Sequence, residues 1–446
     1  MAKTTRKSTP SVLPLPSTAS FNSAMYALGA DVAESLLAGA EWQHRRVESL
    51  SLLEDERSRR RVSIDCTPQR IVWEYEMPLG GGRERQLLVP LAFMAKQSVR
   101  DLDVRDRDGR PLPVLGTEAN GLVAAATIGV LVEALGKKKT GVDDAALWEL
   151  TVSIAMSTSA AAAKELARLF DRVELDEVAK GIIADFAHNF LLIAVLPLDS
   201  VGLRQVVKYS YHWEKGVSPH RDTLGNAIRD VAQSISAGFG LSSYTLGVDV
   251  NGLENSRSFH FECPAPHGLT VHSVRLPTDD SFSEPTDLTA TGVGHAHGHY
   301  SRSSAGLGKL IYVDLRLDPA GLLPRVMAGA IGVFILLASL VAFPSLYVAL
   351  MEAAEGATAV LLSIPALLLG LNARGTENKL VSRMLIPLRL AAVVLALLLF
   401  FLAGLLVLGT SIAIAINLIA TGMLFSIALV ALTTVGYYEL NVSGRK

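Results

Sequence analysis

Cysteine is scarce in this sequence of 446 residues, and its start lacks an apolar run. The two cysteines, Cys66 and Cys263, are too few for a disulfide-stabilised scaffold, which favours a reducing compartment. Lys3, Arg6 and Lys7 are followed by Ser, Thr and Pro instead of the apolar stretch that a secretory signal requires. We therefore expect no signal peptide and a disordered tail over residues 1–24.

An excess of charge of either sign is also missing. Lys and Arg number 41 and Asp and Glu number 43, which gives a formal net charge of -2. Proteins that bind nucleic acid usually carry a clear basic excess, so we expect no nucleic-acid partner.

Familiar catalytic and phosphate-binding motifs are absent from the chain. No GxSxG occurs, and neither residues 80–82 nor residues 238–240 extend to a GxGxxG or a GK[ST] sequence. Asp106 and Asp108 lack the spacing of a calcium loop, because counting back from Gly109 places Val104 at the first ligand position. These residues predict a β-hairpin turn instead. The absences favour a function other than catalysis.

A long C-terminal region without charge is the strongest signal that the sequence does contain. Residues 390–436 include no Asp, Glu, Lys, Arg or His. As a helix this stretch would be about 70 Å long, which is enough to cross a bilayer core of about 30 Å twice. Together with two earlier apolar segments it predicts a bundle of four transmembrane helices at residues 326–350, 357–372, 386–408 and 411–436.

Basic residues near these predicted spans fall on one side. Arg325 precedes the first span, Lys379 and Arg383 lie between the second and third, and Arg445 lies in the tail. The loop between the first and second spans holds acidic Glu352 and no basic residue. The positive-inside rule therefore places both termini, including the tail 439–446, in the cytoplasm. Frequent Arg and Ala are typical of a GC-rich bacterial genome, so we predict a bacterial plasma membrane.

The region before the spans predicts an α+β fold. Alternating and apolar segments predict strands over residues 45–114 and 204–318, and helical segments fill residues 120–195. Asn120 is the expected N-cap of the first of these helices. We expect one cytoplasmic domain over residues 25–320, an antiparallel β-sandwich-like fold with an inserted helical block.

Three alternating histidines, His295, His297 and His299, are the best candidates for a metal site. Alternate residues of a strand point to one face, and neutral imidazoles bind zinc or another divalent metal. Same-face neighbours on one strand are nearly 7 Å apart, however, which fits tetrahedral zinc only if the strand bends. The alternative is an edge strand with solvated histidines. Other residues that could supply a fourth ligand are His260, His267, His272 and Cys263.

A basic cluster lies within the first region of predicted strands. Arg57, Arg59, Arg60 and Arg61 either contact anionic lipid or lie on a solvated hairpin. The sequence leaves both interpretations open.

Several short segments resemble a set of uncharacterised bacterial multi-span membrane proteins that carry a cytoplasmic N-terminal domain. They are residues 89–92 with Lys96, residues 106–113, and the loop at residues 375–378 after a short span containing proline. The resemblance implies the order of soluble domain and then spans, and it implies no activity.

Three functional hypotheses follow. The first is a membrane-anchored binding or scaffold domain, with the lipid bilayer and a protein at the inner membrane face as partners. The second is a channel or effector pore gated by the soluble domain, with the transmembrane helices forming a homo-oligomer. The third is a metal-dependent enzyme built on the histidine cluster. The first needs no cofactor.

Overall fold

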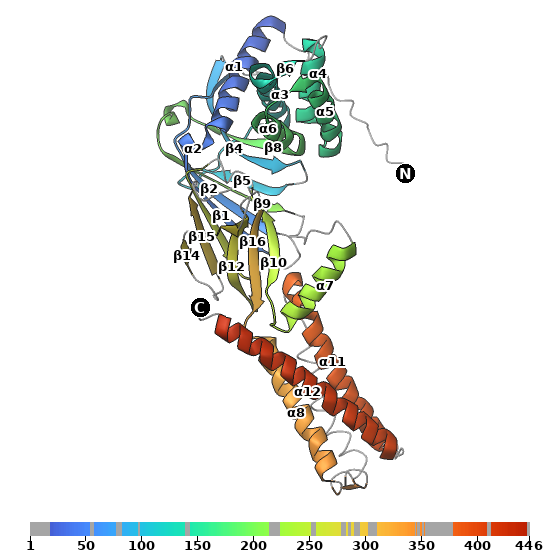
Figure 1. Ribbon diagram of the computed structural model, residues 1–446. Helices are drawn as coiled ribbons and strands as arrows, with labels where there is room; N and C mark the ends of the chain where they lie inside the picture. The colour runs from blue at the N-terminus through green and yellow to red at the C-terminus, as the bar shows by residue number, and fades with distance from the viewer. Residues whose placement is uncertain are drawn as a thin grey trace, which may run out of the picture. The chain divides into compact units, whose positions relative to one another are not determined.

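The structure is a computed structural model with a mixed α and β fold (Figure 1). It describes residues 18–53, 58–76, 83–96, 99–138, 143–213, 224–250, 256–277, 282–283, 287–289, 295–301, 310–343, 345, 348–349, 352, 378–407 and 412–443. The predicted span at 357–372 and the first 17 residues of the predicted tail lie outside the described residues. The chain divides into two compact units, and the first comprises residues 1–44, 64–97 and 104–207. The second comprises residues 45–63, 98–103 and 208–446.

Helices and a small sheet build the first unit. The antiparallel sheet has the order β3 (Val72–Glu76), β4 (Arg83–Ala95) and β8 (Asn189–Leu196). Residues 191–196 of β8 are all buried, which explains why this segment is a continuous apolar run too short to span a membrane. The helices are α1 (Thr18–Leu37), α2 (Gly39–Trp42), α3 (Thr117–Leu135), α4 (Asp144–Met156), α5 (Ser159–Arg172), α6 (Glu177–His188) and the short η1 (Leu198–Ser200), and a strand pair β6 (Lys137–Lys138) and β7 (Val173–Glu174) joins them.

Two helix predictions differ from the structure. The first concerns α3, which begins at Thr117 after Gly116, so Asn120 is inside the helix and is not its N-cap. The Nδ2 of Asn120 instead donates a hydrogen bond of 2.5 Å to the carbonyl of Leu191 on β8. A buried carbonyl that needs a donor thus outweighs the preference of Asn for helix caps. The second concerns α1, which begins at Thr18 and so includes residues assigned to the disordered tail.

Two sheets, most of whose residues belong to the second unit, contribute to one apolar core. A seven-stranded sheet has the order β14-β15-β11-β1-β2-β9-β5, and a four-stranded sheet has the order β10-β16-β12-β13. Apolar residues of β10, β11, β12 and β16 belong to one buried cluster. The seven-stranded sheet consists of β1 (Gln43–Leu52), β2 (Ser58–Cys66), β5 (Arg100–Arg105), β9 (Gln205–Trp213), β11 (Ser258–Pro264), β14 (Asp287–Thr289) and β15 (His295–Ser301). The four-stranded sheet consists of β10 (Tyr244–Asp249), β12 (Leu269–Pro277), β13 (Phe282–Ser283) and β16 (Leu310–Leu317).

The pairing of β1 with β11 departs from the antiparallel expectation. β1 and β11 pair in parallel, with Arg45 opposite Ser258 and Val47 opposite His260. The two strands are far apart in the sequence, so no tight hairpin constrains their direction.

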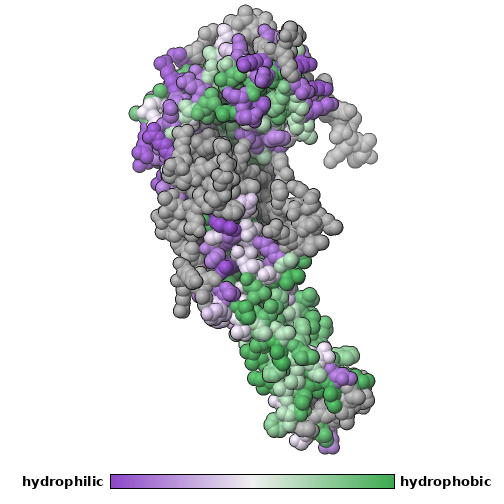
Figure 2. All heavy atoms as spheres, in the orientation of Figure 1, coloured by the Kyte–Doolittle hydropathy of each residue, from purple (hydrophilic) through white to green (hydrophobic). Residues whose placement is uncertain are grey.

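Three long apolar helices complete the second unit. They are α8 (Leu322–Ala342), α11 (Lys379–Val407) and α12 (Ile412–Ser443), which are helices at three of the four predicted spans and are long and apolar enough to cross a membrane. Each packs against the other two, as Figure 1 shows in orange and red. Their buried side chains belong to the same cluster as the sheet residues, while large apolar residues remain exposed on their outer surfaces (Figure 2). An apolar exterior of this size is expected where lipid is the solvent.

A fourth helix in the described part of the chain is also long and apolar enough to cross a membrane. It is α3, but 61% of its most apolar window is buried inside the protein, against 28% for α8 and for α12 and 44% for α11. Its buried residues pack in the core of the first unit with those of α1, α4 and α6. Its apolar character therefore serves a protein core.

Helix α11 begins earlier than the predicted span at 386 because its first residues are anchored to the sheet. The Oδ1 of Asn378 accepts a hydrogen bond from the backbone N–H of Leu380, as a capping residue does. Its Nδ2 donates to the carbonyls of Leu52 and Leu53 at the end of β1, at 3.2 and 2.8 Å. Hydropathy detects only the uncharged part of such a helix.

Candidate ligand site and the predicted histidine site

The structure brings together two of the three predicted metal-site histidines. His297 and His299 project from β15 beside His260 of the neighbouring strand β11, whose ring stacks with both at centroid distances of 5.1 and 4.6 Å. His295 is opposite Pro264 in this register and is exposed. Cross-strand pairing, which the sequence alone does not reveal, therefore selects His260 in place of His295.

A chain of hydrogen bonds connects these imidazoles. The Nδ1 of His260 lies 3.0 Å from Nε2 of His297, and the Oγ of Ser258 lies 3.1 Å from Nε2 of His260 and 3.0 Å from Nε2 of His299. His260 therefore uses Nδ1 toward His297 and Nε2 toward Ser258. Burial, followed by the charge of Arg45 and the two other imidazoles, lowers the pKa of His260 to about 4.

This arrangement does not direct three nitrogens to a single point. A tetrahedral metal needs ligand atoms that converge on it at about 2.0–2.3 Å. Within the described part of the chain, no group of three or more His, Cys, Asp and Glu side chains is arranged to hold a metal ion. Cys263 lies in the apolar core, and burial raises its thiol pKa to about 12. The zinc or divalent-metal hypothesis for His295, His297 and His299 stays a prediction.

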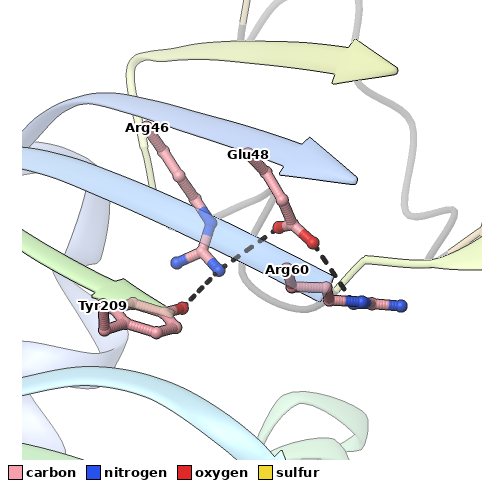
Figure 3. A network of polar contacts seen from close by, with 4 residues as sticks. All are labelled: Arg46, Glu48, Arg60 and Tyr209. Atoms are coloured by element: carbon pink, nitrogen blue, oxygen red, sulfur yellow. Dashed lines mark hydrogen bonds and ion pairs between the residues drawn. The ribbon is translucent and has the colours of Figure 1, made fainter. Parts of the chain in front are cut away.

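A second polar cluster is buried inside the seven-stranded sheet (Figure 3). Glu48 of β1 lies between two guanidinium groups, 3.5 Å from Nη2 of Arg46 and 3.2 Å from Nη1 of Arg60. The same Arg46 nitrogen donates a hydrogen bond of 2.9 Å to the hydroxyl of Tyr209 on β9. Burial raises the pKa of Tyr209 and of its neighbour Tyr211, so both phenols stay protonated.

Hydrophobic patterns could not reveal this cluster. Along β1 the inward face carries Arg46, Glu48 and then Leu50, so polar residues occupy positions where the pattern requires apolar ones. Arg60 was a candidate for lipid contact, but it is buried and paired with Glu48. The alternation of β2 explains the difference, because it turns Arg60 inward and leaves Arg61 exposed.

The first unit contains a groove between α1, α3 and α4. Its volume is about 280 Å³. The lining residues are mostly apolar, with a Tyr, a Trp and two carboxylates: Met25, Tyr26, Ala126, Gly129, Val132, Glu133, Asp144, Leu147, Trp148 and Thr151. The volume is just below the range of about 300–1,000 Å³ that is typical of sites for drug-sized ligands. The occupant would be a small molecule or one protruding side chain.

Two of the lining polar groups interact directly. The hydroxyl of Tyr26 on α1 is hydrogen-bonded to the carboxylate of Glu133 on α3, and burial and this carboxylate raise the pKa of Tyr26 to about 12. Trp148 lines the groove from α4, and its ring lies close to Gly129 of α3. Aromatic rings and carboxylates, with no Lys or Arg among the described lining residues, favour a cation over an anion.

A hydrogen bond between Lys96 and helix α4 stabilises the first unit. The Nζ of Lys96 donates a hydrogen bond of 2.6 Å to the carbonyl of Ile154 in the last turn of α4, and burial lowers its pKa to about 8. A cation at a helix C-terminus stabilises the helix dipole.

Comparison with known proteins supplies no family for these features. No protein-family model matches the chain, and no curated protein is significantly similar to it.

Proposed function

We propose that this chain is a plasma-membrane protein whose water-exposed part lies in the cytoplasm and binds a small organic cation. The observation that carries the membrane assignment is the composition of α8, α11 and α12. They are long and apolar, and they leave large apolar side chains uncovered, such as Ile335, Leu397 and Leu424. Exposing such a surface to water would be unfavourable by roughly 25 cal/mol for each Å².

Charge supports the orientation. The ends of these helices that pack against the sheet carry Arg325 in α8 and Lys379 and Arg383 in α11. Contacts fix which ends these are, because Asn378 binds the end of β1 and Leu323 is buried in the shared core. Basic residues flanking spans remain on the cytoplasmic side.

Carbonate extraction and reporter fusions test the membrane assignment and its orientation. We expect the intact chain to stay in the membrane fraction after carbonate washing. Reporters fused after Glu352 and after Lys379 should report opposite sides of the membrane, with Lys379 inside. Release by carbonate would overturn the membrane assignment, and reporters on one side would overturn the orientation.

The groove of the first unit supports the ligand class. A trimethylammonium or guanidinium group has apolar or planar surface as well as positive charge, so it can contact Trp148 and Tyr26 while Glu133 and Asp144 balance its charge. Each cation–π contact contributes about 0.5–2 kcal/mol, which limits a small ligand to modest affinity.

Titration of the full-length protein in lipid nanodiscs tests this ligand class. Benzyltrimethylammonium is the probe, benzoate is the anionic comparison, and isothermal calorimetry is the readout. We expect the cation to bind and benzoate not to bind, and we expect Glu133→Gln and Trp148→Leu each to weaken binding by about tenfold, or about 1.4 kcal/mol. The matched control is Glu149→Gln, which removes an exposed carboxylate of α4 that does not line the groove. Equal affinity in all variants would refute the groove as the site.

The other hypotheses keep their own tests. A pore requires conductance in planar bilayers and a homo-oligomer in detergent. A metal-dependent enzyme requires bound metal in the purified protein. A protein partner at the inner membrane face requires a complex that survives purification.

A further inference from the structure

Helix α7 (Leu224–Gly238) exposes an apolar face at one end of the transmembrane helices. Val231 is 57% exposed and Ile235 is 47% exposed, and the two residues are four positions apart, so they share one face of the helix. Ala237, on the opposite face, is buried, and so is Ser234 at the edge of the exposed face. The helix is therefore amphipathic, but part of its apolar surface is not turned toward the protein.

Close contacts fix α7 against α11. The two helices pack together, as Figure 1 shows, and α7 also contacts β10 and β16. A Cβ on Gly238 would overlap the carbonyl oxygen of Met384 and would lie 3.2 Å from the ring of Pro387. The last turn of α7 thus lies at the level of residues 384–387 of α11.

That level is where α11 changes from a charged to an apolar exterior. Lys379 and Arg383 precede it, whereas Ile386 and Leu390 are the first of a series of large exposed apolar residues. The guanidinium of Arg389 turns back and donates a hydrogen bond of 2.8 Å to Oγ of Ser382, seven residues nearer the start of the helix. Arginines near the end of a span direct their charge toward the headgroups in this way.

From this placement we infer that α7 is an interfacial helix, whose exposed face is covered by the headgroup and upper acyl region of the bilayer. The inference rests on the proposed membrane location of α11. Continuity with the exposed apolar surface of α11 identifies the occupant, because Gly238, three residues after Ile235, packs against Met384 and Pro387 at the point where that surface begins. Amphipathic helices in this position bury their apolar face about 5–10 Å into the boundary region.

Spin-label accessibility in nanodiscs tests the inference. Nitroxide labels are placed on the full-length protein as Val231→Cys and, separately, as Ile235→Cys. The native thiols of Cys66 and Cys263 are buried and burial raises their pKa values to about 12, so they compete little for the label. Leu203→Cys is the matched control in the first unit, because Leu203 is also 57% exposed, and Leu397→Cys marks the lipid surface of α11.

The expected result is that labels at 231 and 235 collide more often with oxygen, which partitions into lipid, than with a water-soluble nickel chelate. The label at 203 should show the reverse. If labels at 231 and 235 behave like the label at 203 while 397 reports lipid, the interfacial helix is refuted and the membrane assignment stands. Shielding of 231 and 235 from both relaxants would also refute it, in favour of a protein partner. A water-exposed label at 397 would instead refute the membrane assignment.

Discussion

Arg60 on β2 and Glu48 on β1 form an ion pair of 3.2 Å whose side chains are only 5% and 2% exposed. The second guanidinium, from Arg46, approaches the same carboxylate at 3.5 Å. In these two contacts one carboxylate faces two guanidinium groups, and all three side chains are buried. Removing the carboxylate should destabilise the protein more than removing either arginine, because the two remaining guanidinium groups would then repel each other.

Glu48→Gln should destabilise the protein strongly. Removing one member of a buried ion pair costs about 3–5 kcal/mol, and the Gln side chain keeps the shape but not the charge. Thermal unfolding in detergent, followed by intrinsic fluorescence, measures the loss. The control is Arg204→Ala, which removes an exposed pair with Asp65 at 2.8 Å and should cost less than about 1 kcal/mol. Equal losses for the two variants would contradict the electrostatic account.

Acidification should destabilise the native protein partly through His260. Its folded pKa of about 4 is below the unfolded value of 6.5, so the unfolded state binds the proton more tightly. The stability that it contributes is complete above pH 6.5 and is lost as the pH falls toward 4. The His260→Asn variant should therefore lose less melting temperature than the native protein between pH 7 and pH 5. The His267→Asn variant, which alters an exposed histidine, should follow the native protein.

Replacing Gly29 should separate two helices of the first unit. A Cβ at this position of α1 would lie 2.6 Å from the carbonyl carbon of Ala126 on α3, closer than such atoms can approach. We expect Gly29→Ala to cost about 1–3 kcal/mol in unfolding free energy. Gly181→Ala on α6 is the control, because no described atom lies within 4 Å of the added Cβ and alanine favours a helix by about 1 kcal/mol. Destabilisation by both would indicate a general intolerance of substitution.

The same comparison applies to the transmembrane helices. A Cβ on Gly436 of α12 would overlap the carbonyl oxygen of Phe239, between α7 and β10, whereas no described atom lies within 4 Å of one on Gly404 of α11. Gly436→Ala should lower the melting temperature in detergent, and Gly404→Ala should leave it unchanged or raise it slightly. A larger effect at Gly404 would point to a contact with a second copy of the chain.

Sequence patterns predicted the elements whose residue pattern matches the environment that the folded chain gives them. Uncharged runs identified α8, α11 and α12, and alternation identified strands such as β2, β10 and β11. Helix α3 has no such agreement, because it is apolar enough for a membrane and only packing in the first unit distinguishes it from a span. Hydropathy measures the preference of a helix for an apolar environment without specifying which one.

The sites depended on contacts between distant parts of the sequence. His260 joins His297 and His299 only because β11 pairs with β15 in one register, and a shift by one residue would turn the rings to opposite faces. The sequence left Arg60 either in contact with anionic lipid or on a solvated hairpin, and only the position of its strand beside β1 pairs it with Glu48. The groove near Trp148 is formed by three helices, and no linear motif records it.

The contact between Gly436 and Phe239 joins the end of α12 to the short connection that precedes β10. Gly240 in that connection has φ of +76° and lies against Leu440, so its conformation is also matched to the helix. With α12 in a membrane, as proposed, we expect a change in its tilt, such as a thinner bilayer would favour, to displace this connection together with the helix. The thickness of the bilayer would then affect the packing of the sheet that begins there.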